Sequence, residues 1–402
     1  MINKKSPRKN ISVNENPKNE GNYFSSIAGK YKKVSKLIYI LLAAAFALTL
    51  IFNSQLLTYT NFNYLFRDLN TAAESAGDNY NSISYANDTL RAVEKFRGGI
   101  ITVSSNDIAI YTATGRRTFY KSESFVSPKL VTSKKYAIAY ELGGKKYNVY
   151  NSFSKVGGET LKYPISYATV ADNGYFAIVS KDAEYTSVVY LYNDDLSLVN
   201  KYKFATSMVF SVDLSDDGEK IVIFKTETEI DKFSTSVLLC EVGKENSTFD
   251  IKISSGIVCG GGFTSDGNIQ LVTTDGYYLI SSSDGEIISY TAFDSSVNKV
   301  SLTRYGCAVS LLNDLGKVEN KVIVFDENGK TICTMTVNGG IVDMEYFEGY
   351  VFLNQRDHIS KINIKNNAVE SLSISDNGND IIVYDSKNIL LCCQTKAKYI
   401  KI

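Results

Sequence analysis

The stretch SVDLSDDGEKIVIF, residues 211–224, decides the fold, because it reads as a β-strand, an acidic turn with a glycine, and a second β-strand. The stretch TVADNGYFAIVS, residues 169–180, has the same plan. In both, an Asp or Asn before the glycine suits a tight hairpin, since glycine adopts positive φ without steric cost. A chain that repeats one strand–turn–strand unit is predicted to be a repeat protein.

The repeat has a period of about 41 residues, measured at the position just before the second apolar run of each unit. These positions are Gly99, Lys135, Gly174, Gly218, Gly267, Gly306, Gly349 and Asn388. Between Met208 and Ile253, one unit contains four β-rich runs separated by polar turns. Four strands at this period are typical of propeller blades. The sequence therefore predicts an all-β fold, a β-propeller of eight four-stranded blades, with seven as the alternative because the first unit is weakly defined.

The second run of a unit is often apolar without alternation, as in IVIF (residues 221–224) and YFAIV (residues 175–179). A strand covered on both faces has this pattern, and neighbouring blades of a closed ring would provide that cover. The last unit supplies only three strands, in NDIIVYDS, NILLCCQT and AKYIKI. We expect NSISYA, residues 81–86, to add the fourth strand and so close the ring without an exposed edge.

Seven Asp-Gly or Asn-Gly pairs are predicted to form tight hairpin turns. They are Asn173-Gly174, Asp217-Gly218, Asp266-Gly267, Asp275-Gly276, Asp284-Gly285, Asn328-Gly329 and Asn377-Gly378. The alternating ligands and distal glutamate of a calcium loop are missing, so these acids are interpreted as turn residues.

A membrane anchor is predicted at residues 37–57. Its core, LIYILLAAAFALTLIF (residues 37–52), carries polar atoms only at Tyr39 and Thr49. As a helix the whole segment would measure about 31 Å, the thickness of a bilayer's hydrocarbon core. A cleaved signal peptide is the alternative, but no small-x-small cleavage site follows the apolar run.

The residues flanking this segment indicate its orientation. Residues 1–36 are rich in Lys, Asn and Ser and are predicted to form a disordered, basic, cytoplasmic tail. Acids outnumber bases just after the segment, which places residues 80–402, the propeller, outside the cell membrane as part of a single-pass protein. Residues 58–79 are predicted to form a juxtamembrane amphipathic helix or linker, with Phe62, Leu65, Phe66 and Leu69 on one stripe.

The composition argues against several classes of function. The chain has 43 basic and 43 acidic residues, so nothing in its net charge favours nucleic acid. None of the six cysteines forms a CxxC pair, and we expect them to be buried small hydrophobes. No phosphate loop or nucleophile-elbow motif occurs, and no metal or cofactor site is predicted.

Three acids and one histidine are the candidates for chemistry. His358, the single histidine, is expected on a strand and more often at the surface than in a catalytic triad. Asp343 and Glu345 lie two apart on an innermost strand and therefore share a face, and Asp213 holds a comparable place in the fourth unit. Two such carboxylates could act as acid and base on a glycan. A hydrated tunnel lined with polar groups is the favoured interpretation, so no catalytic residue is assigned.

The basic leader, the single anchor, the segment NFNYLFRDLN (residues 61–70) and about 310 residues of strand repeats together show a familiar layout. The chain resembles the uncharacterised membrane-anchored propellers of Gram-positive bacteria, a domain of unknown function with WD40-like and quinoprotein-like repeats. Because the sequence contains no tryptophan, it lacks both the WD dipeptide and the quinoprotein docking signature. The resemblance implies no catalytic residue and no cofactor.

The sequence thus predicts a non-enzymatic binding or scaffold propeller held in the bilayer through residues 37–57. Its expected partner is a cell-envelope protein or glycan. Two alternatives stay open: an envelope glycan hydrolase that uses tunnel carboxylates, and a ligand sensor that signals through the short basic tail.

Overall fold

The structure is a computed structural model that describes residues 17–52 and 80–402, apart from residues 86–88, 229, 231, 245, 255 and 315–317. The chain divides into two units, residues 1–66 and residues 67–402, and each is described by itself.

The first unit contains one helix, α1 (Pro17–Phe52). It begins within the stretch 1–36 that was predicted to be disordered, so that prediction is wrong for residues 17–36. Extending an existing helix costs far less than starting one, and the apolar run 37–52 provides the segment from which it extends. Among the described residues, no helix is both long enough and apolar enough to cross a membrane. Residues 53–57 of the predicted anchor and the predicted juxtamembrane segment 58–79 lie outside the described residues.

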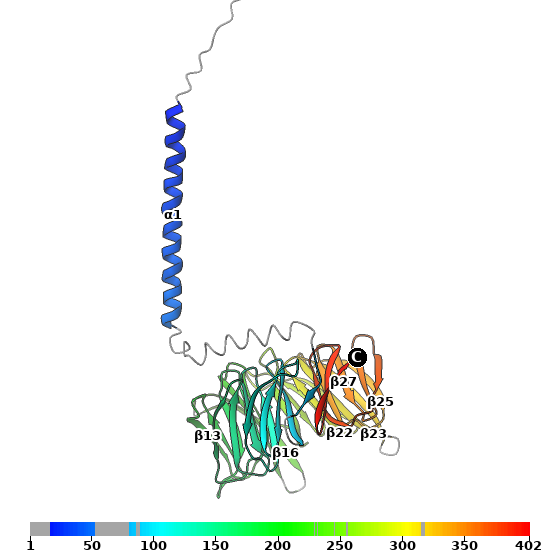
Figure 1. Ribbon diagram of the computed structural model, residues 1–402. Helices are drawn as coiled ribbons and strands as arrows, with labels where there is room; N and C mark the ends of the chain where they lie inside the picture. The colour runs from blue at the N-terminus through cyan, green and yellow to red at the C-terminus, as the bar shows by residue number, and fades with distance from the viewer. Residues whose placement is uncertain are drawn as a thin grey trace, which may run out of the picture. The chain divides into compact units, whose positions relative to one another are not determined.

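The second unit is a β-propeller, and its described residues form eight four-stranded antiparallel sheets (Figure 1). The first four blades, in chain order, are β2 (Leu90–Phe96), β3 (Gly99–Ser104), β4 (Asp107–Tyr111) and β5 (Arg117–Ser122); β6 (Pro128–Thr132), β7 (Tyr136–Glu141), β8 (Lys146–Asn151) and β9 (Lys155–Thr160); β10 (Tyr167–Val170), β11 (Phe176–Ser180), β12 (Ser187–Tyr192) and β13 (Leu198–Phe204); β14 (Met208–Leu214), β15 (Lys220–Thr228), β16 (Phe233–Glu241) and β17 (Ser247–Ser254). The last four are β18 (Val258–Phe263), β19 (Ile269–Thr273), β20 (Gly276–Ile280) and β21 (Ile287–Ala292); β22 (Ser296–Thr303), β23 (Gly306–Asp314), β24 (Glu319–Asp326) and β25 (Thr331–Asn338); β26 (Asp343–Phe347), β27 (Tyr350–Asn354), β28 (His358–Asn363) and β29 (Ala368–Ser373); β30 (Gly378–Val383), β31 (Asn388–Cys393), β32 (Lys396–Lys401) and β1 (Ile83–Ser84). The prediction of eight blades is confirmed.

The eighth blade is shared between the two ends of the propeller. Strand β1 pairs antiparallel with β32, with Ile83 opposite Ala397 and Ser84 opposite Lys396. The first strand of the first blade, β2, also contacts β30, the first strand of the eighth. The predicted closure by NSISYA is therefore confirmed, and the cyan first blade lies beside the red last one (Figure 1).

The core of the ring is divided among the interfaces between blades. Among the residues that the structure describes, eight clusters of buried apolar residues occur, each built from two neighbouring blades. The two second strands whose apolar runs predicted cover on both faces are buried there, β11 along its whole length and β15 over residues 221–224. Adjacent Cys392 and Cys393 belong to different clusters, one on each face of their strand. Each blade is thus covered on both sides by its neighbours, which is why one unit alone could not fold.

The predicted turn chemistry holds at five of the seven glycine pairs. Gly174, Gly218, Gly267, Gly285 and Gly329 have positive φ. At Asp275-Gly276 the tight hairpin between β19 and β20 is present, but Gly276 begins β20 and lacks the positive φ; the prediction for Asn377-Gly378 is wrong, because Gly378 begins β30 after a connection between blades. A Cβ on Gly276 would stand 2.6 Å from the Tyr290 ring, and one on Gly378 would stand 2.3 Å from Leu391. Close packing, not backbone conformation, accounts for glycine at these two positions.

Candidate functional site

One face of the propeller carries the hairpins that join the first and second strands of each blade, and we call it the first-hairpin face. The third-to-fourth-strand turns lie on the same face, because strands alternate in direction within each antiparallel blade. Turns between second and third strands lie on the opposite face. The chain enters the ring on the first-hairpin face, where Asn81 N–H donates to the Ala113 carbonyl, 3.1 Å away.

Arg304 is the central side chain of this face. It lies in the first hairpin of the sixth blade and reaches across the fifth blade to the fourth. Its Nη1 donates to Asp213 Oδ2 (2.5 Å), its Nε to Asp216 Oδ1 (3.0 Å) and its Nη2 to the Leu214 carbonyl (2.8 Å). Nη1 also donates to the Phe263 carbonyl of the fifth blade at 3.0 Å. One guanidinium therefore connects the fourth, fifth and sixth blades on the first-hairpin face.

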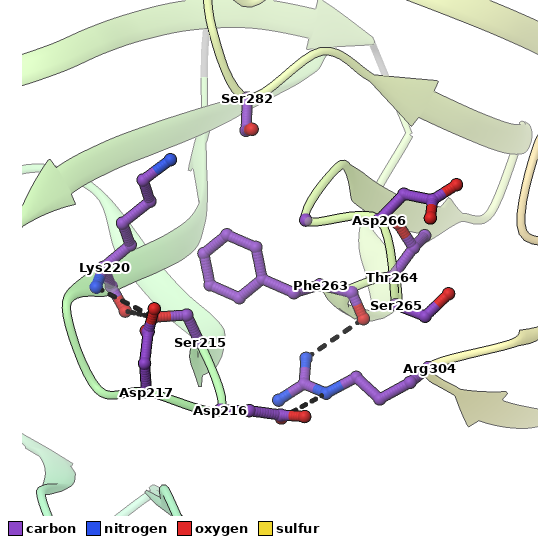
Figure 2. A pocket seen from close by; sticks show the side chains of 11 residues that line it. Ser215, Asp216, Asp217, Lys220, Phe263, Thr264, Ser265, Asp266, Ser282 and Arg304 are labelled. Atoms are coloured by element: carbon purple, nitrogen blue, oxygen red, sulfur yellow. Dashed lines mark hydrogen bonds and ion pairs between the residues drawn. The ribbon is translucent and has the colours of Figure 1, made fainter.

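Two pockets flank Arg304 and share Asp216, Ser265 and Arg304 in their walls. The first, of about 330 Å³, lies over the fourth and fifth blades; Figure 2 shows its lining side chains and the bonds from Arg304 to Asp216 and to the Phe263 carbonyl. The second, of about 420 Å³, continues over the second and third blades and includes Lys134, Asp172 and Tyr305. Together they form a polar trough across five blades.

Some polar groups of the trough are held by the protein and others face the pocket unpaired. Lys134 forms an ion pair with Asp172 at 2.9 Å, and Asn173 donates to the Asp217 carbonyl at 2.7 Å. Among the described residues, the Lys220 amine and the Asp266 carboxylate have no hydrogen-bond or ion-pair partner. Those two unpaired groups line the first pocket, where an incoming ligand could reach both of them.

Charged turn residues on the first-hairpin face separate into two sectors. The acidic sector comprises the turns of the third to sixth blades, whose described charged residues are the acids Asp172, Asp194, Asp195, Asp216, Asp217, Glu219, Asp266, Asp284, Glu286 and Glu327 and the bases Lys244, Arg304 and Lys330. The basic sector comprises the turns of the seventh, eighth, first and second blades, whose charged residues are the bases Arg97, Arg116, Lys134, Lys135, Lys365, Lys387 and the acids Glu348 and Asp385. The face therefore has a charge asymmetry that the zero net charge of the chain conceals.

The predicted pair Asp343 and Glu345 lies on the innermost strand β26, as expected, and both are half-buried. Asp343 Oδ2 accepts from the Ile381 N–H and Glu345 Oε2 from the Val383 N–H, each at 2.8 Å, so both cap the free edge of β30. Burial raises the pKa of Glu345 to about 7. Neither carboxyl lines the two pockets beside Arg304.

Glu94 on β2 joins this group of acids across the closure of the ring. The pKa of Glu94 is raised to about 8, mainly by burial and then by the negative charges of Glu345, Asp380 and Asp343. The positive charge of Lys129 partly offsets this increase. Sequence reasoning missed Glu94 because the first unit is the least regular repeat.

The structure places the other sequence candidates apart from one another. Asp213 is on the innermost strand β14, as expected, but it is bound by Arg304 and accepts from the Phe263 N–H at 2.9 Å. Burial raises its pKa even though Arg304 lies beside it. His358 begins β28 on the opposite face, with Nδ1 2.7 Å from Asp357 Oδ1. Of the cysteines, all are free and only Cys259 is exposed, which departs from its expected burial. In the part of the chain that the structure describes, no group of His, Cys, Asp and Glu is arranged to hold a metal ion.

Comparison with known proteins adds a family and a fold. The model of a family of unknown function, DUF5711, matches residues 76–402. No curated protein matches the chain. Among solved structures, the chain is similar to Saccharomyces cerevisiae Sqt1 (TM-score 0.58, 10% identity, 80% of this chain and 98% of that chain) and to BamB from Moraxella catarrhalis (0.54, 9%, 80% and 100%). It is also similar to Chaetomium thermophilum Sqt1 bound to the N-terminus of the ribosomal protein L10 (0.58, 9%, 81% and 100%). At these identities the likeness shows the propeller fold alone.

Proposed function

The chain belongs to DUF5711, a family of unknown function. From that premise we propose that it is a binding or scaffold propeller whose acidic sector binds a basic segment of a partner protein. The observation that carries the proposal is the polar trough beside Arg304, set within turns that bear ten acids and three bases. Such a surface attracts and orients a cationic segment, and opposite potentials raise the rate of encounter.

The partner is proposed to be a cell-envelope protein, because the sequence favours an anchor at residues 37–57 with the propeller outside the membrane. An anchor would confine the search to the membrane plane and raise the effective concentration of membrane partners. Chaetomium thermophilum Sqt1, a propeller of similar fold, is bound to the N-terminus of a ribosomal protein. That example supports a protein segment as the kind of ligand such a ring can take. A glycan partner fits less well, because ten acids and three bases dominate the turns of the acidic sector, although the exposed ring of Tyr305 in the second pocket is a surface on which a sugar could stack.

Reversing two acids of the acidic sector, of which Asp266 lines the trough, tests this function. Glu219 and Asp266 are exposed turn residues of the acidic sector. The double variant Glu219→Lys, Asp266→Lys is expected to lose at least about tenfold in affinity for an octalysine peptide and for the native partner, because four units of charge are changed at the contact. The measurements are calorimetric titration with the peptide and crosslinked capture from membranes.

The matched control is Glu159→Lys, Glu184→Lys, which makes the same charge change at exposed residues outside the first-hairpin face. It should bind as the parent protein does. Capture of the same proteins by all three forms would show that the acidic sector is not the binding surface.

The glycan-hydrolase alternative has one observation in its favour, the raised pKa of Glu345 and Glu94 inside the ring. Against it, Asp343 and Glu345 already accept backbone hydrogen bonds from the next blade. We expect Asp343→Asn, Glu345→Gln to leave every envelope phenotype intact, since the amide oxygens can still accept those bonds. Loss of a cell-wall glycan cleavage activity in that variant, with unchanged thermal unfolding, would instead favour the hydrolase.

A further inference from the structure

We propose that the basic sector of the first-hairpin face rests on an anionic lipid surface, so that this sector is a second docking site with a different kind of partner from the acidic one. The proposal goes beyond the protein-binding function and does not depend on it. It starts from the charge of four contiguous blades, whose turns carry six bases and two acids, with one of the bases, Lys134, paired to Asp172 of the acidic sector.

Two lysines of these turns, and a third at the adjoining end of β32, give this sector accessible charge. Lys365 lies in the last turn of the seventh blade, Lys387 in the first hairpin of the eighth, and Lys401 at the end of β32. All three are exposed, and their amines have no ion-pair partner among the described residues. Lys387 and Lys401 lie close together, because the N–H of Ile402 donates to the Lys387 carbonyl at 2.9 Å. Exposed amines on one face are suited to a planar array of phosphate headgroups.

The two acids of the sector oppose this charge without cancelling it. Asp385 Oδ2 accepts from the Tyr80 hydroxyl at 3.1 Å and from Asn388 Nδ2 at 2.7 Å, and its Oδ1 accepts from the Lys387 backbone N–H at 2.8 Å. Asp385 is therefore occupied in holding its own hairpin. Glu348 is the one other acid among these turns, so the sector keeps a positive balance.

The point at which the chain enters the ring lies in this same sector. Tyr80 stacks on Tyr384 and Tyr399 of the eighth blade, with ring centroids 4.9 and 5.8 Å apart. A protein held at a bilayer by residues before Tyr80 would be tethered from its basic sector, and each nearby Lys or Arg would add about 1 kcal/mol of attraction to anionic lipid. The acidic sector occupies the other half of the face, and an anionic surface would repel it.

Amide exchange of the full-length protein in lipid nanodiscs tests the proposal. Hydrogen–deuterium exchange is compared in discs of phosphatidylcholine and in discs that also contain phosphatidylglycerol. We expect residues 364–367 and 384–387 to exchange several-fold more slowly on the anionic discs, with the protection lost at about 0.5 M salt, where the Debye length falls below about 5 Å. Residues 281–286 of the acidic sector should not change.

Two charge-matched triple variants make the test specific. The triple variant Lys365→Gln, Lys387→Gln, Lys401→Gln removes three charges from this surface. The equilibrium constant for docking on anionic discs should fall by up to about 100-fold, because each charge contributes roughly 1 kcal/mol of attraction. Lys145→Gln, Lys162→Gln, Lys181→Gln removes three exposed lysines from the opposite face and should keep the protection. All six lysines are exposed, so both variants should fold.

Several outcomes would overturn the assignment. Equal protection on neutral and anionic discs, no protection on either, or equal loss in both triple variants would each do so. Protection by soluble polyphosphate without protection on anionic discs would assign the sector to an anionic polymer instead of a lipid surface.

Discussion

Glu94→Gln is expected to raise the free energy of unfolding by about 2–3 kcal/mol at pH 8.5 and to leave it nearly unchanged at pH 4. The pKa of Glu94 rises from 4.5 to about 8 on folding, because the carboxyl is buried among Glu345, Asp380 and Asp343. Each pKa unit corresponds to about 1.4 kcal/mol, and we take about half of the full value because the side chain is only partly buried. A neutral amide of the same shape removes the cost of ionisation.

The direction of the pH dependence follows from proton linkage. Below pH 4.5 both the folded and the unfolded protein hold the Glu94 proton, so the group has no effect on stability. Between pH 4.5 and 8 the unfolded chain releases the proton and the folded chain keeps it, so stability falls as the pH rises. Above pH 8 the loss is complete and constant.

Urea unfolding of the parent protein and of Glu94→Gln from pH 4 to 9 measures this effect, because urea does not screen charge. The exposed Glu184→Gln on the opposite face is the matched control and should follow the parent at every pH. A difference between parent and Glu94→Gln that is the same at pH 5 and pH 8.5 would contradict the account, since it could not arise from ionisation.

Arg304→Ala is expected to destabilise the propeller by about 3 kcal/mol. The substitution removes hydrogen bonds to the fourth and fifth blades and leaves Asp213, whose side chain is 20% exposed, as a largely buried carboxylate without its counter-ion. Removing one member of a buried pair costs more than the pair contributes, because the remaining charge stays desolvated. Chemical unfolding at pH 7 gives the measurement.

A double variant distinguishes the cost of leaving Asp213 without its counter-ion from the cost of losing the packing of the Arg304 side chain. Arg304→Met, Asp213→Asn removes both charges, and the Asn oxygen can still accept from the Phe263 N–H, so we expect at least half of the lost stability to return. Lys330→Ala, an exposed base in the same acidic sector, should change stability by less than about 0.5 kcal/mol. An Arg304→Ala protein as stable as the Lys330→Ala control would show that the bridge does not hold the blades together.

Much of the fold follows from the sequence, because each feature that defines a blade is local. A tight hairpin requires glycine at positions such as Gly218, and a strand covered on both faces requires an unbroken apolar run such as residues 221–224. Both signals recur at the blade period, so the number of blades and the shared eighth blade could be predicted. Glycines 276 and 378 were misassigned because the same residue also serves close packing, which depends on neighbours distant in sequence.

The candidate site was less predictable, because its contacts are not local. Arg304 binds Asp213 and Asp216, which lie 91 and 88 residues earlier in the chain, and no spacing rule connects them. The two charged sectors were within reach of the sequence, since aligning the turns of successive units reveals the change from acids to bases. The raised pKa of Glu94 was not, because it depends on strands from three different blades.

The short pairing of β1 with β32 is the point at which we expect the ring to open when its N-terminal end is pulled. Among the described residues, two residue pairs join these strands, with the Tyr85 bond to Thr395, the Tyr399 bond to Ser82, the Asn81 bond to Ala113 and the Tyr80 contacts beside them. A force along the N-terminal segment would load this pairing first and would separate β1 from β32 one residue pair at a time. Loss of β1 would open the ring at one seam before the remaining blades unfolded, and the chain would stay connected, because β1 continues into β2.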